Sequence, residues 1–93
     1  MDMKDLPSLI TVGADSRPYL VATSIATLVR EGRPVTVQAI GSAAAEQAMK
    51  AAAVAWRSLK AEGISVACSP FFAEVTVDSQ KTTSVRLEVV GGN

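Results

Sequence analysis

Residues 34–50 read PVTVQAIGSAAAEQAMK, and this stretch decides the fold. Apolar and polar side chains alternate from Val35 to Ile40, which predicts a strand with one buried face. Gly41 ends the alternation, and an alanine-rich run that begins at Ser42 predicts a helix. A strand that leads through one glycine into a helix exposes the first backbone N–H groups of that helix. Such groups bind anions, so the stretch indicates a contact with phosphate.

The composition restricts the classes of function that the chain fits. Its 93 residues make one domain, in which nine Lys and Arg residues balance nine Asp and Glu residues. A neutral chain binds nucleic acid only where a few cations are placed together. The sequence has no histidine, the commonest general base and metal ligand, and it has no phosphate-binding glycine motif. We therefore expect a protein without enzymatic activity, without a metal site and without a cofactor.

The same composition bears on the compartment and on the single thiol. Cys68 is the one cysteine, so no internal disulfide is possible, and its apolar surroundings indicate a buried thiol. No apolar run reaches the length of a membrane span, and the first residues lack a signal-peptide pattern. We expect a cytoplasmic protein without membrane contact.

Periodicity predicts the order β-α-β-α-β-β. A strand is expected over 9–14 and a helix over 18–31, before the strand and the helix of the opening stretch, the latter ending near Glu62. The fold class is α/β, an α+β two-layer sandwich in which two helices cover one face of a mixed sheet and the other, polar face stays open. The apolar stripe of the second helix is expected to comprise Ala45, Ala48, Met49, Ala52, Ala55, Trp56 and Leu59.

The last two strands require a break in their alternation. Apolar residues change from even to odd positions after Pro70, which predicts a bulge at Ser69–Phe71. A hairpin loop of residues 79–81 then sets Glu74 opposite Arg86. Around this domain, residues 9–90, we expect a flexible N-terminal tail over 1–8 and a frayed C-terminus over 91–93.

Four motifs carry a resemblance to a known family. They are VQAIG (37–41), QAMKA (47–51), SPFF (69–72) and TVDSQKTTSVRLEV (76–89). Through them the sequence resembles the bacterial stage V sporulation protein S family, within the Alba-like superfamily. The resemblance implies an Alba-like fold, a homodimer or higher oligomer, and nucleic acid, DNA or RNA, as a partner. The family is tied to spore maturation in some bacteria.

Six residues are candidates for contact with phosphate: Ser16, Arg17, Gly41, Ser42, Lys50 and Lys81. Arg17 precedes a proline and is expected at the N-cap of the first helix, where a cation is unfavourable unless it serves an anion. Gly41 lets a phosphate approach the backbone, and Ser42 offers a hydroxyl. Lys50 lies on an exposed helix face, and Lys81 lies at the hairpin tip.

Each candidate also has an ordinary structural interpretation. Arg17 is then a solvated side chain, and Ser42 is the N-cap of its helix. Lys50 then pairs with Glu46 one turn earlier, and Lys81 solvates its turn. Trp56 fits a core or subunit contact better than base stacking, and an outward Phe72 fits a dimer interface.

Our hypothesis from the sequence is a non-enzymatic, backbone-directed nucleic-acid-binding protein with a regulatory role. The alternative is a protein-interaction or assembly module without nucleic-acid binding, which zero net charge and the small-residue helix favour. A third interpretation is a small anionic ligand held at Gly41.

Overall fold

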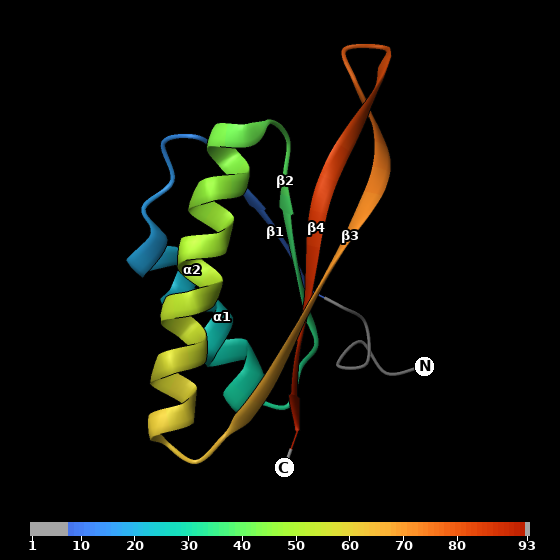
Figure 1. Ribbon diagram of the computed structural model, residues 1–93. Helices are drawn as coiled ribbons and strands as arrows, with labels where there is room; N and C mark the ends of the chain where they lie inside the picture. The colour runs from blue at the N-terminus through green and yellow to red at the C-terminus, as the bar shows by residue number, and fades with distance from the viewer. Residues whose placement is uncertain (1–7, 93) are drawn as a thin grey trace.

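The computed structural model describes residues 8–92. Six elements follow one another: β1 (Ser8–Val12), α1 (Pro18–Arg30), β2 (Val35–Ala39), α2 (Ser42–Ala61), β3 (Ser65–Val77) and β4 (Gln80–Gly92). The strands form one mixed sheet in the order β1-β2-β4-β3, and both helices lie on the same side of it (Figure 1). The predicted fold class, a two-layer sandwich in the order β-α-β-α-β-β, is confirmed.

The core lies between the two helices and the sheet. Ile25 of α1, Leu59 of α2 and the valines of β2 are fully buried in it. The buried side of α2 is almost entirely alanine, which lets this helix lie close to its neighbours. Its fully or nearly fully buried residues are Ala44, Ala48, Ala51, Ala52, Ala55 and Leu59.

The predicted stripe of α2 is partly wrong. Met49 and Trp56, expected in the core, are exposed, while Ala44 and Ala51 are buried in their place. The reason is that α2 packs against α1 as well as against the sheet. The buried side is therefore turned toward α1, and the two larger side chains are left on the flank next to β3.

The strand pairing places three features at one end of the sheet. β1 and β2 are parallel and end together at the pair Val12–Ala39, so the helix that follows each strand begins at this end of the sheet. β2 pairs antiparallel with β4 through residues 85–89 only, with Val85 opposite Ala39. Residues 73–84 of the β3–β4 hairpin therefore continue past the end of β2 as a two-stranded arm (Figure 1). We call residues 73–84 the arm.

The predicted bulge at Ser69–Phe71 is wrong. β3 and β4 pair without interruption from Ser65–Gly92 to Val77–Gln80. The expectation of a bulge assumes that every apolar residue of β3 faces the helices, whereas the regular strand turns Phe71 to the open face and Phe72 to the helix side. Pro70 fits this regular strand because β3 is an edge strand, in which a missing N–H group can face solvent.

The hairpin turn also differs from the prediction. It has two residues, Asp78 and Ser79, with φ of 50° and 64°, as in a type I′ turn, and not a loop of residues 79–81. In this register Glu74 lies opposite Thr83, so the predicted Glu74–Arg86 pair is wrong. Arg86 instead donates from Nε to Gln38 Oε1 at 2.8 Å.

The boundaries of the domain shift slightly. Ser8, expected in the tail, opens β1 and donates its N–H to Pro34 O at 3.0 Å, while residues 1–7 and 93 lie outside the described residues. β1 ends at Val12, two residues before the expected end. Gly91 and Gly92, expected to fray, pair in β4. A Cβ at Gly91 would lie 2.7 Å from Val29 Cγ1, so the close approach of α1 requires glycine there.

Candidate nucleic-acid interface

The turn before α1 and the start of α2 are held together at one end of the sheet. Gln47, in the second turn of α2, donates from Nε2 to the Ala14 carbonyl at 3.1 Å. This bond fixes the segment that carries Ser16 and Arg17 against the helix that begins at Ser42. Four of the six predicted site residues therefore lie at the same edge, because β1 and β2 are parallel and end side by side.

Arg17 lies at the N-cap of α1, as its position before Pro18 predicts. Its backbone is extended (φ −91°, ψ 116°), and its side chain makes no capping hydrogen bond. The guanidinium group is exposed and forms no ion pair within residues 8–92. Ser16 has a structural role, since its Oγ accepts the Gly13 N–H at 2.9 Å and closes the turn. Arg17 is thus the cation of this turn that is available to an anion.

Gly41 is the N-cap of α2, and the interpretation of Ser42 as the cap is wrong. Gly41 has φ 91° and ψ 157°, a conformation that essentially only glycine adopts. A Cβ at this position would meet nothing within 4 Å, so glycine is needed here for its backbone angles and not for room. Ser42 is the first helical residue, its hydroxyl is exposed, and no side chain caps the first turn. The first N–H groups of α2 therefore point to the end of the molecule without a side-chain acceptor.

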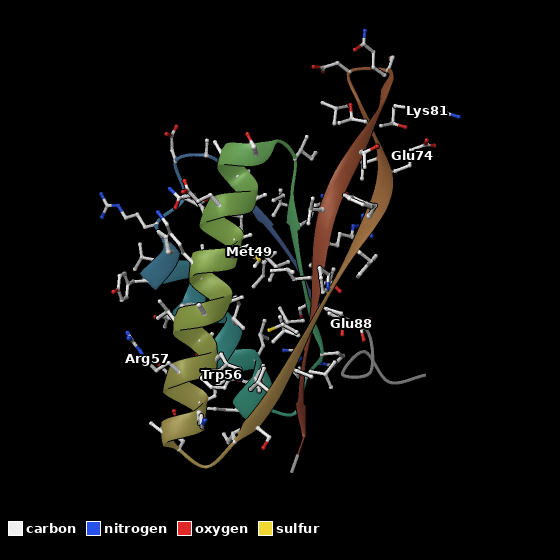
Figure 2. All side chains as sticks on the ribbon, in the orientation of Figure 1. Met49, Trp56, Arg57, Glu74, Lys81 and Glu88 are labelled. Carbon is white, nitrogen blue, oxygen red and sulfur yellow. The ribbon has the colours of Figure 1, made fainter. Side chains whose placement is uncertain are left out.

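The two lysines of the predicted site lie apart from this cluster. Lys50 Nζ is 4.0 Å from Glu46 Oε1, and both side chains are exposed, which makes this a weak surface pair. Lys81 lies on the arm, with its Nζ 3.8 Å from Glu74 Oε1 (Figure 2). The arm also carries Asp78 at its turn. The arm is slightly acidic because it carries two carboxylates, Glu74 and Asp78, and one lysine, Lys81. A contact of the arm with a phosphate would therefore depend on Lys81 alone.

Arg57 is a cation that the predicted site does not include. It is exposed, lies two helical turns after Lys50, and forms no ion pair within the part of the chain that the structure describes. Both side chains lie on the side of α2 that points away from the core. The sequence indicates Arg57 through its spacing, because two basic residues that are seven positions apart on one helix lie on the same side of that helix.

A second surface is apolar. A hollow of about 230 Å³ lies between α2 and β3, and Met49, Trp56, Cys68 and Pro70 are among its lining residues. Phe72, 78% exposed, lies on the same side of β3. Cys68, predicted to be buried, is exposed because β3 is the edge strand and has no further strand beside it. Its partial burial still raises the pKa of its thiol. A surface of this kind is typical of a protein contact.

Trp56 itself is held on this flank by a cation. Lys60 Nζ lies 4.7 Å from the centroid of the Trp56 ring, within the range of a cation–π contact. The predicted core position of this ring is therefore wrong, while a subunit contact remains an expectation.

Residues 8–92 hold no cluster of three or more potential metal-ligating side chains. None of the helices they form is both long and apolar enough to cross a membrane.

Comparison with known proteins agrees with the architecture. Among solved structures, the chain is similar to Alba from Thermoplasma volcanium, with a TM-score of 0.58 and 11% sequence identity, over 92% of this chain and 100% of that one. At this identity the likeness shows the fold. The family model for stage V sporulation protein S matches residues 8–91, which is nearly all of the chain. The chain therefore belongs to the stage V sporulation protein S family and has an Alba-like fold.

Proposed function

We propose that this chain is a non-enzymatic regulatory protein that binds the backbone of nucleic acid, DNA or RNA. One observation carries the proposal: the parallel pairing of β1 and β2 brings the starts of both helices to the edge from which the arm projects. The Alba-like fold supports the proposed binding of nucleic acid. The match to the stage V sporulation protein S family supports a role in sporulation as part of the proposal.

The contacts would be made by groups that have no strong partner within residues 8–92. Arg17 would meet one phosphate, the first N–H groups of α2 with the Ser42 hydroxyl a second, and Lys81 a third, with Lys50 in support. Asp15 and Glu46 are exposed in the same region. These carboxylates lower the affinity, while the dependence on salt follows from the number of phosphate contacts.

Three to four phosphate contacts per subunit set the size of the salt effect. With a slope of about −0.9 per contact, the affinity for duplex DNA should fall roughly 40- to 150-fold between 50 and 200 mM salt. A slope of this size separates backbone binding from contacts made through uncharged groups.

Fluorescence anisotropy of labelled duplex DNA and RNA at these two salt concentrations tests the proposal. The double variant Arg17→Glu/Lys81→Glu should abolish binding. Lys60→Glu, which reverses one charge in the last turn of α2 at the opposite end of this helix, is the control for a charge reversal outside the site and should retain binding. An absence of binding by the unmodified chain at 50 mM salt would remove the proposal.

The second candidate function is an assembly module without nucleic-acid binding, and the hollow between α2 and β3 favours it. Its apolar residues suit a homodimer, in which the same surface of a second copy covers Met49 and Phe72. Light scattering after gel filtration should show a dimer for the unmodified chain and a monomer for Met49→Glu/Phe72→Glu. The Arg17→Glu/Lys81→Glu variant should leave assembly intact, which separates the two functions.

A further inference from the structure

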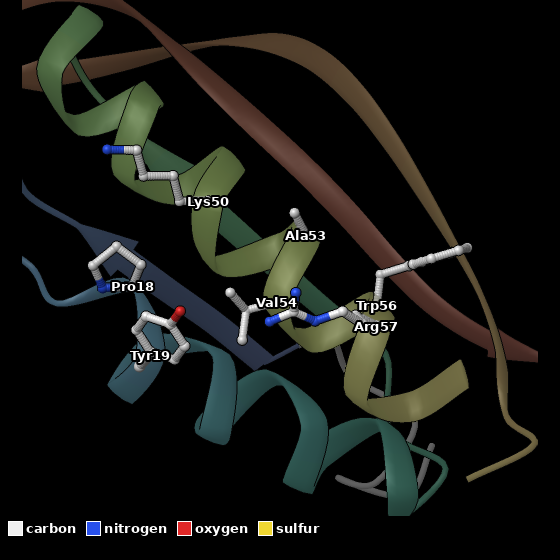
Figure 3. A pocket seen from close by; sticks show the side chains of 7 residues that line it. All are labelled: Pro18, Tyr19, Lys50, Ala53, Val54, Trp56 and Arg57. Carbon is white, nitrogen blue, oxygen red and sulfur yellow. The ribbon is translucent and has the colours of Figure 1, made fainter. Parts of the chain in front are cut away.

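A groove of about 500 Å³ lies between the first turn of α1 and the middle of α2 (Figure 3). Pro18, Ala53 and Val54 line it with apolar surface, and Tyr19, Lys50 and Arg57 bring an aromatic ring and two cations to it. Val54 is the α2 side chain that lies toward Tyr19 (Figure 3). The volume of the groove is that of a site for a small molecule or for one unit of a polymer.

The charge of the groove has one sign. Two of its lining residues are cations, and none of the carboxylates in residues 8–92 lines it. Lys50 has only its long, exposed contact with Glu46, and Arg57 has no ion-pair partner within residues 8–92. The two are seven residues apart, which is about 10 Å along a helix axis. An anionic group on the occupant is therefore attracted at two points along the groove.

Tyr19 supplies the flat surface. Tyr19 follows directly on Pro18, the first residue of α1, and is 68% exposed. Its ring lies across the groove from α2 (Figure 3). Trp56 also lines the groove, although the end of its ring is directed toward the other side of α2 (Figure 3). A base can stack on the tyrosine ring and rest its edge against Val54, since stacking needs only an aromatic face.

We infer that this groove binds an unpaired nucleotide of a single-stranded nucleic acid, with its base on Tyr19 and its phosphates at Lys50 and Arg57. The inference rests on the proposed function, because the groove adjoins Arg17 and would hold part of the same strand. It adds what the proposed function leaves open, the form of the nucleic acid. The bases of a duplex are stacked on one another and offer no free face to the ring, so a single strand is preferred.

The test compares matched variants by anisotropy with a labelled single-stranded 12-mer, as DNA and as RNA, and with the corresponding duplex. Tyr19→Ala should weaken binding of the single strand by about 5- to 100-fold, and Tyr19→Phe, which keeps the ring, should not. Leu20→Ala is the control, because Leu20 is the next residue, is 63% exposed and does not line the groove. Binding of the duplex should be equal in all four proteins.

A second pair of variants tests the charges. Arg57→Gln should reduce the slope of log affinity against log salt for the single strand by about 0.7, the value for one phosphate contact. Lys60→Gln, which removes a cation of the same helix outside the groove, should leave the slope unchanged. Amide chemical shifts should change at Tyr19, Ala53 and Val54 on addition of the strand.

Each contrary result has its own meaning. Unchanged single-strand binding by Tyr19→Ala overturns the inference and leaves the proposed function standing if Arg17→Glu/Lys81→Glu still abolishes binding. A free mononucleotide that binds as tightly as the 12-mer also overturns it, because the groove is then a site for a small molecule. A chain that binds duplex but not the single strand contradicts the inference alone, and one that binds neither contradicts both.

Discussion

Replacing Gly41 by alanine tests the account of how α2 begins. Gly41 has φ 91° and ψ 157°, and a side chain in this region of backbone space costs about 1–3 kcal/mol. An alanine also reduces the entropy of the unfolded chain, which offsets about 0.4–1 kcal/mol of this. No clash contributes, because an added Cβ meets nothing within 4 Å. The free energy of unfolding should therefore fall by about 1–2 kcal/mol, a decrease of roughly 5–15 °C in Tm for a domain of this size.

Urea unfolding followed by far-ultraviolet circular dichroism measures this change at constant protein concentration. Gly92→Ala is the matched control: its φ lies outside the left-handed region and an added Cβ there also meets nothing. The smaller entropy of its unfolded chain should therefore make this variant more stable than the unmodified chain by about 0.4–1 kcal/mol. Gly41→Asn should be as unstable as Gly41→Ala, because asparagine tolerates the left-handed helical region but not a ψ near 157°. If Gly41→Ala unfolds at the same urea concentration as Gly92→Ala, the backbone explanation of this glycine is refuted.

Three further measurements test the packing and the surface. Leu59→Ala should lower the free energy of unfolding by about 2–5 kcal/mol in urea titrations, since Leu59 is fully buried and alanines around it cannot refill the cavity. Arg30 donates from Nε to Glu62 Oε1 at 2.8 Å and lowers the pKa of this carboxyl in the folded chain. The pair therefore stabilises the fold at pH values above the unfolded-state pKa of Glu62, and this stability is lost as the pH falls through the lower folded-state pKa. The urea midpoints of the unmodified chain and of Glu62→Gln should converge as the pH is lowered. A difference that stays constant with pH contradicts the pairing. Cys68 should react with iodoacetamide more slowly in the folded chain than in 8 M urea at pH 8, because burial raises its pKa; equal rates, followed by mass spectrometry, contradict this.

Local sequence patterns predicted the elements and the fold class, because the formation of a helix or a strand depends mainly on residues that are close together in the chain. The alternation in 35–40, the glycine that follows and the alanine-rich run are properties of one segment, and the structure has a strand, a positive-φ N-cap and a helix there. The position of Arg17 at a helix start follows in the same way from the proline after it. What the same patterns could not supply is the direction in which each side of an element faces.

The errors share this cause. The core residues of α2 depend on where α1 lies, and the exposure of Met49 and Trp56 follows from that. Apolar parity predicts the bulge and the hairpin register on the assumption that one face of β3 is buried. β3 is, however, an edge strand that extends beyond the helices (Figure 1), so its apolar residues can face either side. Phe71 and Phe72 show this, since they are adjacent and lie on opposite faces.

By itself, then, the sequence determined the order of the elements and the one-sided sheet, since both depend on short-range sterics and on the period of apolar residues. Only the tertiary structure decided which groups of different elements share a surface. Lys50, Arg57 and Tyr19 meet in one groove because two helices pack side by side, and the arm projects beside the helix starts because β1 and β2 are parallel. Both arrangements depend on contacts between segments far apart in the chain, which no local pattern encodes.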